Sequence, residues 1–313
     1  MKLVLDRLVW GAARAGREGL LVCVRSPGSA HGRWPLSDVE VKHGVVSSTT
    51  VHVLDCGGTG RPVVLIHGWP LSSESWQAQI PALTTAGYRV IAYDRRGFGH
   101  SDKPRGGYDY DTLTEDLEGL LNNLDLRDVT LVGFSMGGGE VARYISEYGE
   151  ERVHSVVFAS AVPPYMLHGS DNPDGTLTKE KAAQMMGQLV ADRDGFFDQF
   201  TTEFFSVDGV LKISEQQRQD AIALCQQSSE KAALKCMKSF GTEDFRDDLL
   251  KVTVPTLVLH GNGDGIVPFE GSGARTHAAI AHSQLVLLEG APHGCNVSHA
   301  DQFNNALLDF LTS

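Results

Sequence analysis

The 313-residue chain has none of the features typical of membrane-spanning, disulfide-framed or zinc-binding proteins. No apolar run approaches the length that crosses a bilayer. The five cysteines are odd in number and scattered, and no two are spaced as C-x-x-C. This usage predicts reduced thiols in a cytosolic protein rather than disulfides or a zinc site.

Basic residues are also scarce. Lys and Arg number 27 against 39 Asp and Glu, so the formal net charge is −12, and no basic run or stripe is present. These features argue against a nucleic-acid-binding surface. The apolar stretches near the N-terminus are short and interrupted by charge, unlike the core of a signal peptide. We therefore expect a cytoplasmic protein that binds neither nucleic acid nor a membrane.

From about residue 45 onward, β-branched apolar runs alternate with helical patterns. Strands are predicted at 49–55, 63–66, 88–94, 128–132, 153–159, 254–261 and 284–289, and helices at 73–86, 112–124 and 136–148. Such alternation predicts the α/β class, with a mostly parallel sheet flanked by helices on both faces. Sites in such proteins form at the carboxyl ends of the strands.

Residues 162–250 interrupt this alternation. Pro163-Pro164 and Asn172-Pro173 open a stretch of mainly helical character without strong strands. We interpret it as a helical cap over the active-site end of the sheet, where a few of its aromatic residues should line an apolar pocket. The chain is thus divided into an N-terminal extension of unknown role (1–40), a first core segment (41–161), the cap (162–250) and a second core segment (251–313).

The sequence Gly133-Phe134-Ser135-Met136-Gly137 lies between a predicted strand and a predicted helix. A serine at such a junction takes a strained backbone conformation, and the glycines on either side leave room for it. The strain lifts the hydroxyl away from the sheet, while the start of the helix offers free N–H groups to a developing negative charge. Ser135 is therefore a candidate nucleophile.

A serine nucleophile needs a general base and a carboxylate that orients the base. On this type of scaffold they follow the serine in the order Asp or Glu, then His. Asp264 follows the strand at 254–261 and His293 follows the strand at 284–289, each in a glycine-bounded loop. Three residue types in the right order, each just past a strand, predict a catalytic triad of Ser135, Asp264 and His293.

Other histidines and acids fit these roles less well. His67 and His260 also end strands, but each is followed by glycine and is expected to support loop structure. His299 stands at the predicted start of the last helix, where a surface or capping role is expected. Asp94 closes a strand but precedes two arginines, so an ion pair or a turn cap is the better interpretation.

The loop after the strand at 63–66 has the sequence His67-Gly68-Trp69-Pro70. On this scaffold that loop gives one backbone N–H to the oxyanion, and the residue after the nucleophile gives the other. The amides of Trp69 and Met136 are therefore the candidate oxyanion donors. Loss of one such donor typically costs about 2.7–4 kcal/mol of transition-state stabilisation.

Several motifs together resemble one branch of the α/β-hydrolase family, the cofactor-free bacterial haloperoxidases, arylesterases and perhydrolases. They are His67-Gly-Trp-Pro, Tyr93-Asp-Arg-Arg-Gly-Phe-Gly-His-Ser, Leu131-Val-Gly-Phe-Ser-Met-Gly-Gly-Gly-Glu, Val254-Pro-Thr-Leu-Val-Leu-His-Gly, Gly265-Ile-Val-Pro-Phe-Glu and Ala291-Pro-His-Gly. The resemblance spans roughly residues 45–313. It implies an α/β-hydrolase fold with an inserted helical cap, and ester hydrolysis by Ser135, Asp264 and His293 without haem, metal or flavin.

The resemblance also implies a reaction in which hydrogen peroxide replaces water. A peracid then forms from a carboxylic acid or ester, and it oxidises halide outside the protein. Members with proline at the position of Pro70 tend to favour this reaction, so Pro70 is a candidate for tuning it. The expected partners are a small-molecule ester and hydrogen peroxide, with no cofactor and no metal, and a homo-oligomer stays open.

Two positions near the predicted triad depart from the family pattern. Asn262 stands where the family usually has an Asp, which leaves Asp264 as the sole carboxylate of its loop. Cys295 replaces a usual aromatic two residues past His293, where a changed pocket shape or an oxidisable thiol is expected.

Two other functions stay open at this point. A related hydrolase could cleave amides or lactams on the same triad. A receptor of the same fold could bind its ligand with only slow turnover. Epoxide hydrolases and haloalkane dehalogenases fit less well, because they need an aspartate where Ser135 stands.

Overall fold

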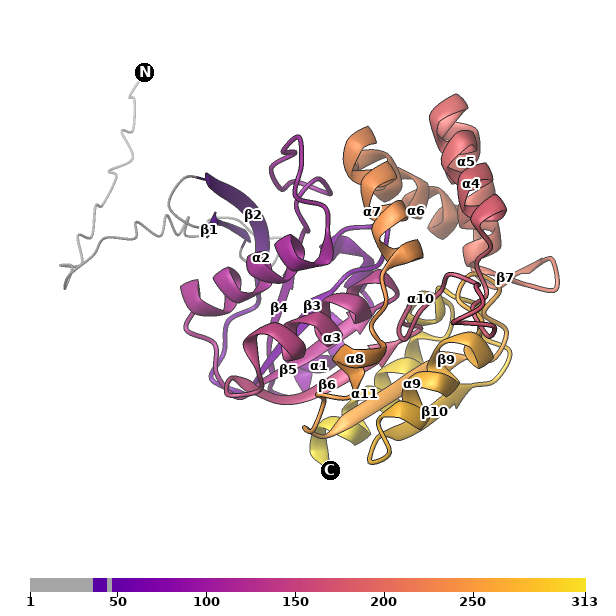
Figure 1. Cartoon of the computed structure of the whole chain (residues 1–313). Coiled ribbons are helices and arrows are strands. Elements are labelled where there is room, and N and C mark those ends of the chain that lie inside the picture. The colour runs from indigo at the N-terminus through magenta and orange to yellow at the C-terminus, as the bar shows by residue number, and fades with distance from the viewer. Residues whose placement is uncertain (1–35, 44–46) are drawn as a thin grey trace, which may run out of the picture.

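A mixed sheet forms the centre of the computed structural model, which describes residues 36–43 and 47–313 (Figure 1). Its eight strands lie in the order β1-β2-β4-β3-β5-β6-β9-β10. β1 and β2 pair antiparallel, and β2 pairs antiparallel with β4. All the other pairs, from β4 to β10, are parallel. The predicted α/β class with a mostly parallel sheet is therefore confirmed.

The strands of this sheet are β1 (Leu36–His43), β2 (Ser47–Asp55), β3 (Pro62–Ile66), β4 (Arg89–Tyr93), β5 (Val129–Phe134), β6 (Val153–Ala159), β9 (Thr256–Gly261) and β10 (Gln284–Leu288). The helices outside the segment 162–250 are η1 (Ser73–Trp76), α1 (Ile80–Thr85), α2 (Tyr110–Asn123), α3 (Met136–Tyr148), η2 (Phe269–Gly271), α9 (Gly273–Ala279), α10 (Cys295–Ser298) and α11 (Ala300–Thr312). Most predicted strands and helices are found within a few residues of these bounds.

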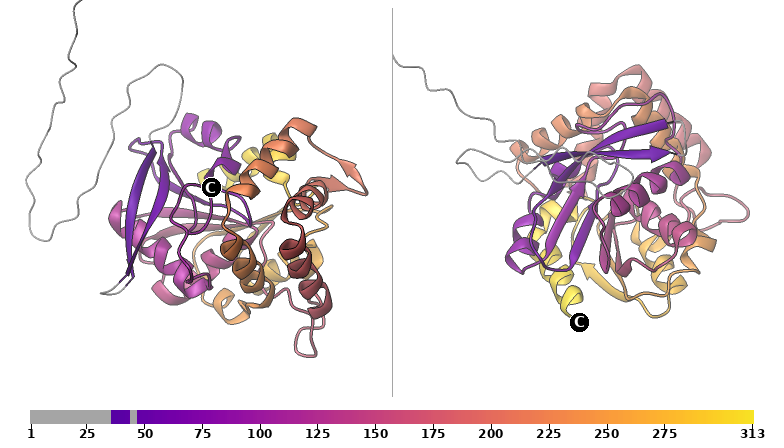
Figure 2. Two further views of the ribbon diagram at one scale, coloured as in Figure 1. Left: turned by 90° about the horizontal axis from the view of Figure 1, so that it is seen from above. Right: turned by 90° about the vertical axis from the view of Figure 1, so that its left-hand side faces the viewer.

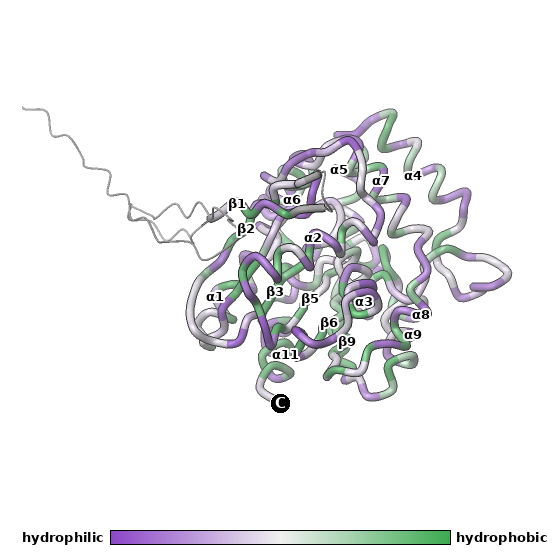
Figure 3. Tube along the Cα trace, turned by 60° about the vertical axis from the view of Figure 1, so that its left-hand side comes forward, coloured by the Kyte–Doolittle hydropathy of each residue, from purple (hydrophilic) through white to green (hydrophobic). Residues whose placement is uncertain are grey.

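The sheet is covered by helices on both faces, as the two views of Figure 2 show. Every residue of β5 and of β9 is buried, and hydrophobic residues follow the central strands (Figure 3). Strands covered on both faces are apolar throughout rather than alternating between apolar and polar residues. The continuous apolar runs in the sequence therefore predicted these strands. The helix predicted at 73–86 is split into η1 and α1, and Pro81 lies in the first turn of α1, where its missing N–H is tolerated.

The first strand was missed by the sequence analysis. β1 pairs along its whole length with β2, so residues 36–40 belong to the sheet and not to an extension that ends at residue 40. Val39 and Val41 are buried while Asp38 and Glu40 are exposed, which is the two-residue period of a strand with one solvated face. The remainder of the predicted extension, residues 1–35, lies outside the described residues.

The segment between β6 and β9 contains α4 (Lys179–Ala191), α5 (Arg193–Phe204), β7 (Ser206–Val207), β8 (Val210–Leu211), α6 (Glu215–Gln227), α7 (Glu230–Thr242) and α8 (Arg246–Leu249). In Figures 1 and 2, α4 to α7 form a group to one side of the sheet. The division of the chain at residues 161 and 250 stays a prediction, and we use the word cap for residues 162–250. Among the described residues, no helix combines the length and the hydrophobicity needed to cross a bilayer.

The role of β1 can be tested with two neighbouring substitutions. Val41 is fully buried, so Val41→Ala should lower the free energy of unfolding by about 2 kcal/mol, through lost burial and the cavity left behind. Thermal unfolding should then shift down by about 4–8 °C. Glu40→Ala, on the exposed face of the same strand, is the control and should leave the melting temperature nearly unchanged. Equal melting temperatures for both variants would contradict the placement of β1.

Candidate active site

Ser135 occupies the sharp turn between β5 and α3. Its backbone has φ 55° and ψ −117°, a conformation that a residue with a side chain rarely adopts and that costs on the order of 1–3 kcal/mol. The surrounding backbone holds it there. The Ser135 N–H donates to the carbonyl of Ala159 at 2.9 Å, and the Ser135 carbonyl accepts from the amides of Gly138 at 3.0 Å and Val162 at 3.2 Å.

Two glycines allow the turn to be this tight. A Cβ at Gly133 would lie 2.5 Å from the carbonyl oxygen of Gly137, and a Cβ at Gly137 would lie 2.5 Å from the carbonyl oxygen of Ile66. A side chain at either position would therefore push the start of α3 away from β5 or β3. The requirement for glycine on both sides of Ser135 was expected from the sequence.

The three residues of the predicted triad are joined by hydrogen bonds. His293 Nε2 lies 2.9 Å from Ser135 Oγ, and His293 Nδ1 lies 2.7 Å from Asp264 Oδ2. All three side chains are buried, with relative exposures of 1% to 6%. Because Asp264 accepts from Nδ1–H, the other ring nitrogen is left to accept the proton of the serine hydroxyl.

Both carboxylate oxygens of Asp264 contact hydrogen-bond donors. Its Oδ1 accepts from the amides of Ile266 at 2.9 Å and Val267 at 2.8 Å. Burial by itself would raise the pKa of Asp264, but attraction to His293 and hydrogen bonds from His260 and His293 outweigh it and keep that pKa well below its usual range. The carboxylate therefore stays ionised in contact with His293.

His260 was assigned only a loop role from the sequence, and its contact with Asp264 was missed. His260 Nε2 lies 2.9 Å from the carbonyl oxygen of Val267 and 3.3 Å from Asp264 Oδ2. Its ring is fully buried at the end of β9. One ring N–H thus faces both the loop backbone and the carboxylate that orients His293. The available signal was a histidine four residues before the acid.

The candidate oxyanion donors are the backbone amides of Met136, directly after Ser135, and of Trp69, in the loop after β3. Met136 is the first residue of α3, so its N–H has no acceptor within the helix. The ring of Trp69 is 3% exposed, and its Nε1–H donates to the carbonyl of Ala233 in α7 at 2.9 Å, which ties this loop to the cap. Pro70 is buried directly after Trp69, and the peptide bond between them is cis. The roles of the two amides and of Pro70 stay predictions.

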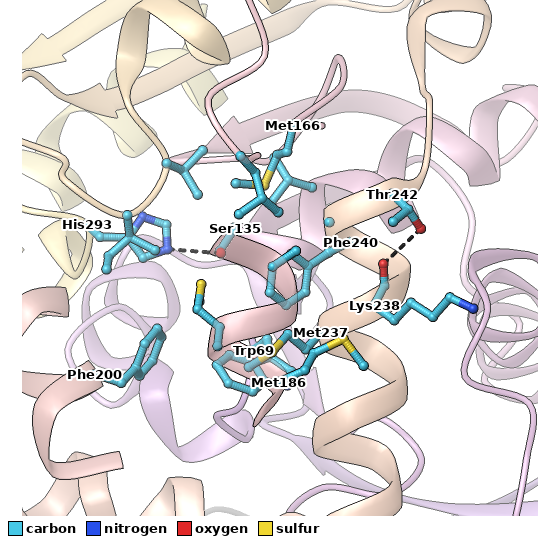
Figure 4. Close-up of a pocket in the computed structure, with 17 residues that line it drawn as sticks. Trp69, Ser135, Met166, Met186, Phe200, Met237, Lys238, Phe240, Thr242 and His293 are labelled. Atoms are coloured by element: carbon cyan, nitrogen blue, oxygen red, sulfur yellow. Dashed lines mark hydrogen bonds between the residues drawn. The ribbon is translucent and has the colours of Figure 1, made fainter. Parts of the chain in front are cut away.

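A largely apolar pocket opens in front of Ser135 and His293 (Figure 4). Its walls come from the loops after β3, β6 and β9, and from the cap helices α4, α5 and α7. The residues that line it besides Ser135 and His293 are Trp69, Val162, Met166, Leu177, Ala182, Met185, Met186, Phe200, Met237, Lys238, Phe240, Gly241, Thr242, Ile266 and Val267. The cap aromatics expected at a pocket are thus identified as Phe200 and Phe240.

The sequence and fold of this chain are similar to those of known proteins. The family model described as the alpha/beta hydrolase fold matches residues 61–300. The chain belongs to this family. A non-haem chloroperoxidase of Kitasatospora aureofaciens is 42% identical over 257 residues, covering 81% of this chain and 93% of that protein. A bifunctional esterase/perhydrolase of Acinetobacter calcoaceticus is 36% identical over 262 residues, covering 83% and 95%.

Solved structures agree with this assignment. The crystal structure of a bromoperoxidase from Bacillus anthracis matches with a TM-score of 0.85 and 49% sequence identity, and the match covers 89% of this chain and 100% of that one. The predicted α/β-hydrolase fold and the resemblance to the branch of non-haem haloperoxidases and esterase/perhydrolases are therefore confirmed. The protein is an enzyme, a hydrolase of this family.

A buried ion pair supports the loop after β3, which carries Trp69, in this α/β-hydrolase. The guanidinium of Arg95 donates to Glu140 Oε1 in α3 at 2.6 Å and to the carbonyl of His67 at 2.6 Å. Tyr93 donates its hydroxyl to the second oxygen of Glu140 at 3.0 Å, and His67 Nε2 accepts the Arg95 amide at 3.0 Å. The loop after β3 and the helix after Ser135 are thus fixed to each other, and His67 has the loop role expected of it.

The carboxylate of Asp94 caps two turns, one of the two roles that the sequence favoured. Its Oδ1 accepts from the amide of Ser73 and its Oδ2 from the amide of His100, both at 2.8 Å. His299 lies at the start of α11, as expected. Asp94 therefore has the turn-capping role expected of it, whereas His299 occupies the N-cap position of α11 without a side-chain cap hydrogen bond, and its Nδ1 contacts Ser298 Oγ at 3.0 Å.

The two departures from the family pattern have structural explanations. Asn262 donates to Glu289 at 2.6 Å and accepts from the amide of Gly290 at 2.7 Å, so it joins the loops that carry Asp264 and His293. Cys295 is fully buried, with its sulfur 3.5 Å from Ser160 Oγ. Burial raises the pKa of the Cys295 thiol to about 12, which leaves almost no reactive thiolate at neutral pH.

The contact between His260 and Asp264 generates a prediction. In His260→Leu the carboxylate loses one donor and the carbonyl of Val267 loses the nearer of its two donors, so Asp264 should hold His293 less firmly. Hydrogen bonds to charged groups contribute about 1.5–3 kcal/mol, so we expect kcat for p-nitrophenyl acetate to fall by about 10- to 100-fold.

His282→Leu is the matched control for this measurement. His282 also uses Nε2 to contact a backbone carbonyl, that of Val254 at 2.9 Å, but it is exposed and away from Asp264. The control should keep the wild-type kcat. A wild-type kcat in a folded His260→Leu enzyme would show that this histidine supports only the loop.

Proposed function

We propose that the enzyme cleaves small carboxylic esters, with aryl or short acyl groups, through a covalent acyl-enzyme. The observation that carries the proposal is the continuous hydrogen-bond chain from Ser135 through His293 to Asp264 at one wall of an apolar pocket. A relative is named as an esterase/perhydrolase, which supports the same chemistry. We expect the enzyme to act on this ester in the cytoplasm. Assembly into a homo-oligomer is an open question.

Acylation of Ser135 begins the proposed reaction. His293 Nε2 takes the hydroxyl proton while Ser135 Oγ attacks the ester carbonyl carbon. The carboxylate of Asp264 keeps the proton on Nδ1 and stabilises the imidazolium cation that forms. The amides of Trp69 and Met136 donate to the oxyanion of the tetrahedral intermediate. When this intermediate collapses, His293 returns the proton to the departing alcohol.

Water ends the reaction by attacking the acyl carbon while His293 takes one of its protons. The bond to Ser135 Oγ breaks, the serine is reprotonated, and a carboxylic acid leaves. Hydrogen peroxide can take the place of water, in which case the product is a peroxycarboxylic acid. Relatives named as chloroperoxidase, bromoperoxidase and perhydrolase favour this second reaction for the same site. Halide outside the pocket would then reduce the peracid to the carboxylic acid and become hypohalous acid.

The pocket lining favours small, weakly polar acyl groups. Its walls are mainly methionine, phenylalanine and aliphatic side chains, so a charged acyl group would lose its hydration without gaining a partner. The lining contains a single Lys or Arg, Lys238, and it is exposed. We therefore expect acetate, propionate and aryl esters to be better substrates than esters of dicarboxylic acids.

A substrate panel tests the reaction class. We expect acetate and aryl esters to be hydrolysed with a burst of alcohol followed by rapid steady turnover, and peracid to appear when hydrogen peroxide is added. Bromination of a dye in the presence of bromide reports the peracid. A preference for amides or lactams would favour the related hydrolase instead. Binding of an ester with negligible turnover would favour a receptor of the same fold.

Removal of the nucleophile tests whether one acyl-enzyme feeds both reactions. Ser135→Ala should lower both ester hydrolysis and peroxide-dependent bromination by about 10⁴-fold or more, with the melting temperature kept. Ser298→Ala is the control, because the Ser298 hydroxyl also contacts a histidine, His299 at 3.0 Å, without lining the pocket. Bromination that persists in Ser135→Ala would reveal an oxidation site independent of the acyl-enzyme.

A further inference from the structure

Methionines are concentrated at the pocket to an unusual degree. The chain has six methionines, of which the structure describes five. Four of these five line the same pocket as Ser135 and His293, namely Met166, Met185, Met186 and Met237. All four belong to the cap, and Figure 4 shows Met166, Met186 and Met237 around the space in front of the serine. The fifth, Met136, is fully buried in the core.

Thioethers are the side chains of this lining that a peracid oxidises most readily. A thioether reacts without losing a proton, whereas a cysteine must first become a thiolate. Cys295, two residues past His293, and Cys236, next to Met237, are both fully buried, and neither lines the pocket. Met185 and Met186 are partly exposed, and Met166 and Met237 are 6% and 5% exposed. Among the described residues, an oxidant released at Ser135 therefore meets thioether sulfur before it meets a thiol.

We propose that the four pocket methionines are a modification site, which the peroxycarboxylic acid formed at Ser135 oxidises to methionine sulfoxide. The inference rests on the peroxide-using half of the proposed function. The sulfur lone pair attacks the outer peroxy oxygen, the O–O bond breaks, and an S–O bond forms. The hydroxyl proton moves to the carboxylate. One peracid is reduced to a carboxylic acid, and one thioether is oxidised by two electrons.

Oxidation would change what the pocket accepts. A sulfoxide is polar and stiffer than a thioether, so it places an acceptor without a partner among the phenylalanine and aliphatic side chains of the lining. Apolar acyl groups should then bind less well. The enzyme would limit its own peracid production, and a methionine sulfoxide reductase could restore it, because the modification is reversible by that class of enzyme.

The experiment compares wild type with Ser135→Ala in the same ester and hydrogen peroxide, measuring released peracid by dye bromination and each methionine by peptide mass spectrometry. We expect the pocket methionines to gain oxygen at least about tenfold faster in wild type, because the oxidant is released beside them. Peracetic acid added to Ser135→Ala should oxidise the same four methionines before Met136.

The outcomes separate this inference from the proposed function. Peracid released by wild type while the pocket methionines stay reduced would overturn the inference and leave the function standing. Equal oxidation in wild type and Ser135→Ala would also overturn it, because bulk hydrogen peroxide would then be the oxidant. If wild type releases no peracid, the peroxide reaction and the inference both fail.

A second variant links the modification to activity. Each enzyme is compared with its own untreated rate, so differences in starting activity do not matter. After incubation with the ester and hydrogen peroxide together, wild type should lose about tenfold in kcat/KM for an apolar ester, and reductase treatment should restore it. The variant with all four pocket methionines replaced by leucine, a volume-conserving change, should keep its own rate. Met136→Leu, the control, should decline as wild type does. An equal loss in the four-leucine variant would contradict the role of these methionines.

Discussion

The backbone of Ser135 is the constraint on which the rest of the site depends. The positive φ of Ser135 directs Oγ away from the sheet. Oγ then lies at the edge where β9 and β10 also end and where the loops that carry Asp264 and His293 begin. The conformation is unfavourable in isolation and persists because β6 and the start of α3 bind the backbone on both sides. Gly133 and Gly137 let strand and helix approach closely enough to form those bonds. The same two glycines therefore allow both the close packing of α3 against the sheet and the backbone conformation that presents the Ser135 hydroxyl.

A buried ion pair connects this turn to the loop after β3, which carries Trp69. Arg95 and Glu140 are at most 1% exposed, and such a pair is tolerated in an interior only where hydrogen bonds satisfy both partners. Here the guanidinium also binds the carbonyl of His67, and the carboxylate also binds Tyr93. The network thus links β3, β4 and α3. Movement of the loop that carries Trp69 would break contacts to the helix that follows Ser135.

Sequence patterns predicted the parts of this enzyme whose signals are local. Ser135 and Asp264 follow β5 and β9, in which every residue is buried, and His293 follows β10, which is mostly apolar in sequence but partly exposed. In each case an apolar run is followed by a polar residue within a few positions, so the sequence shows both together. β1 was missed because its charged outer face hides a strand whose partner is β2. The Arg95–Glu140 pair spans 45 positions, and the contact of His260 with Asp264 depends on how one loop folds back. Neither leaves a pattern in one stretch of sequence.

The methionines that the cap contributes to the pocket have two opposing properties, adaptability to the substrate and sensitivity to oxidation. Methionine side chains are flexible and polarisable, so a lining rich in them can adapt to acyl groups of different shape without a new backbone conformation. The sulfur that gives this adaptability is also the atom most exposed to an oxidant made in the same pocket. Leucine would resist oxidation but would adapt less. A hydrolase that uses only water has no reason to avoid methionine here, whereas one that uses peroxide changes its own pocket with turnover.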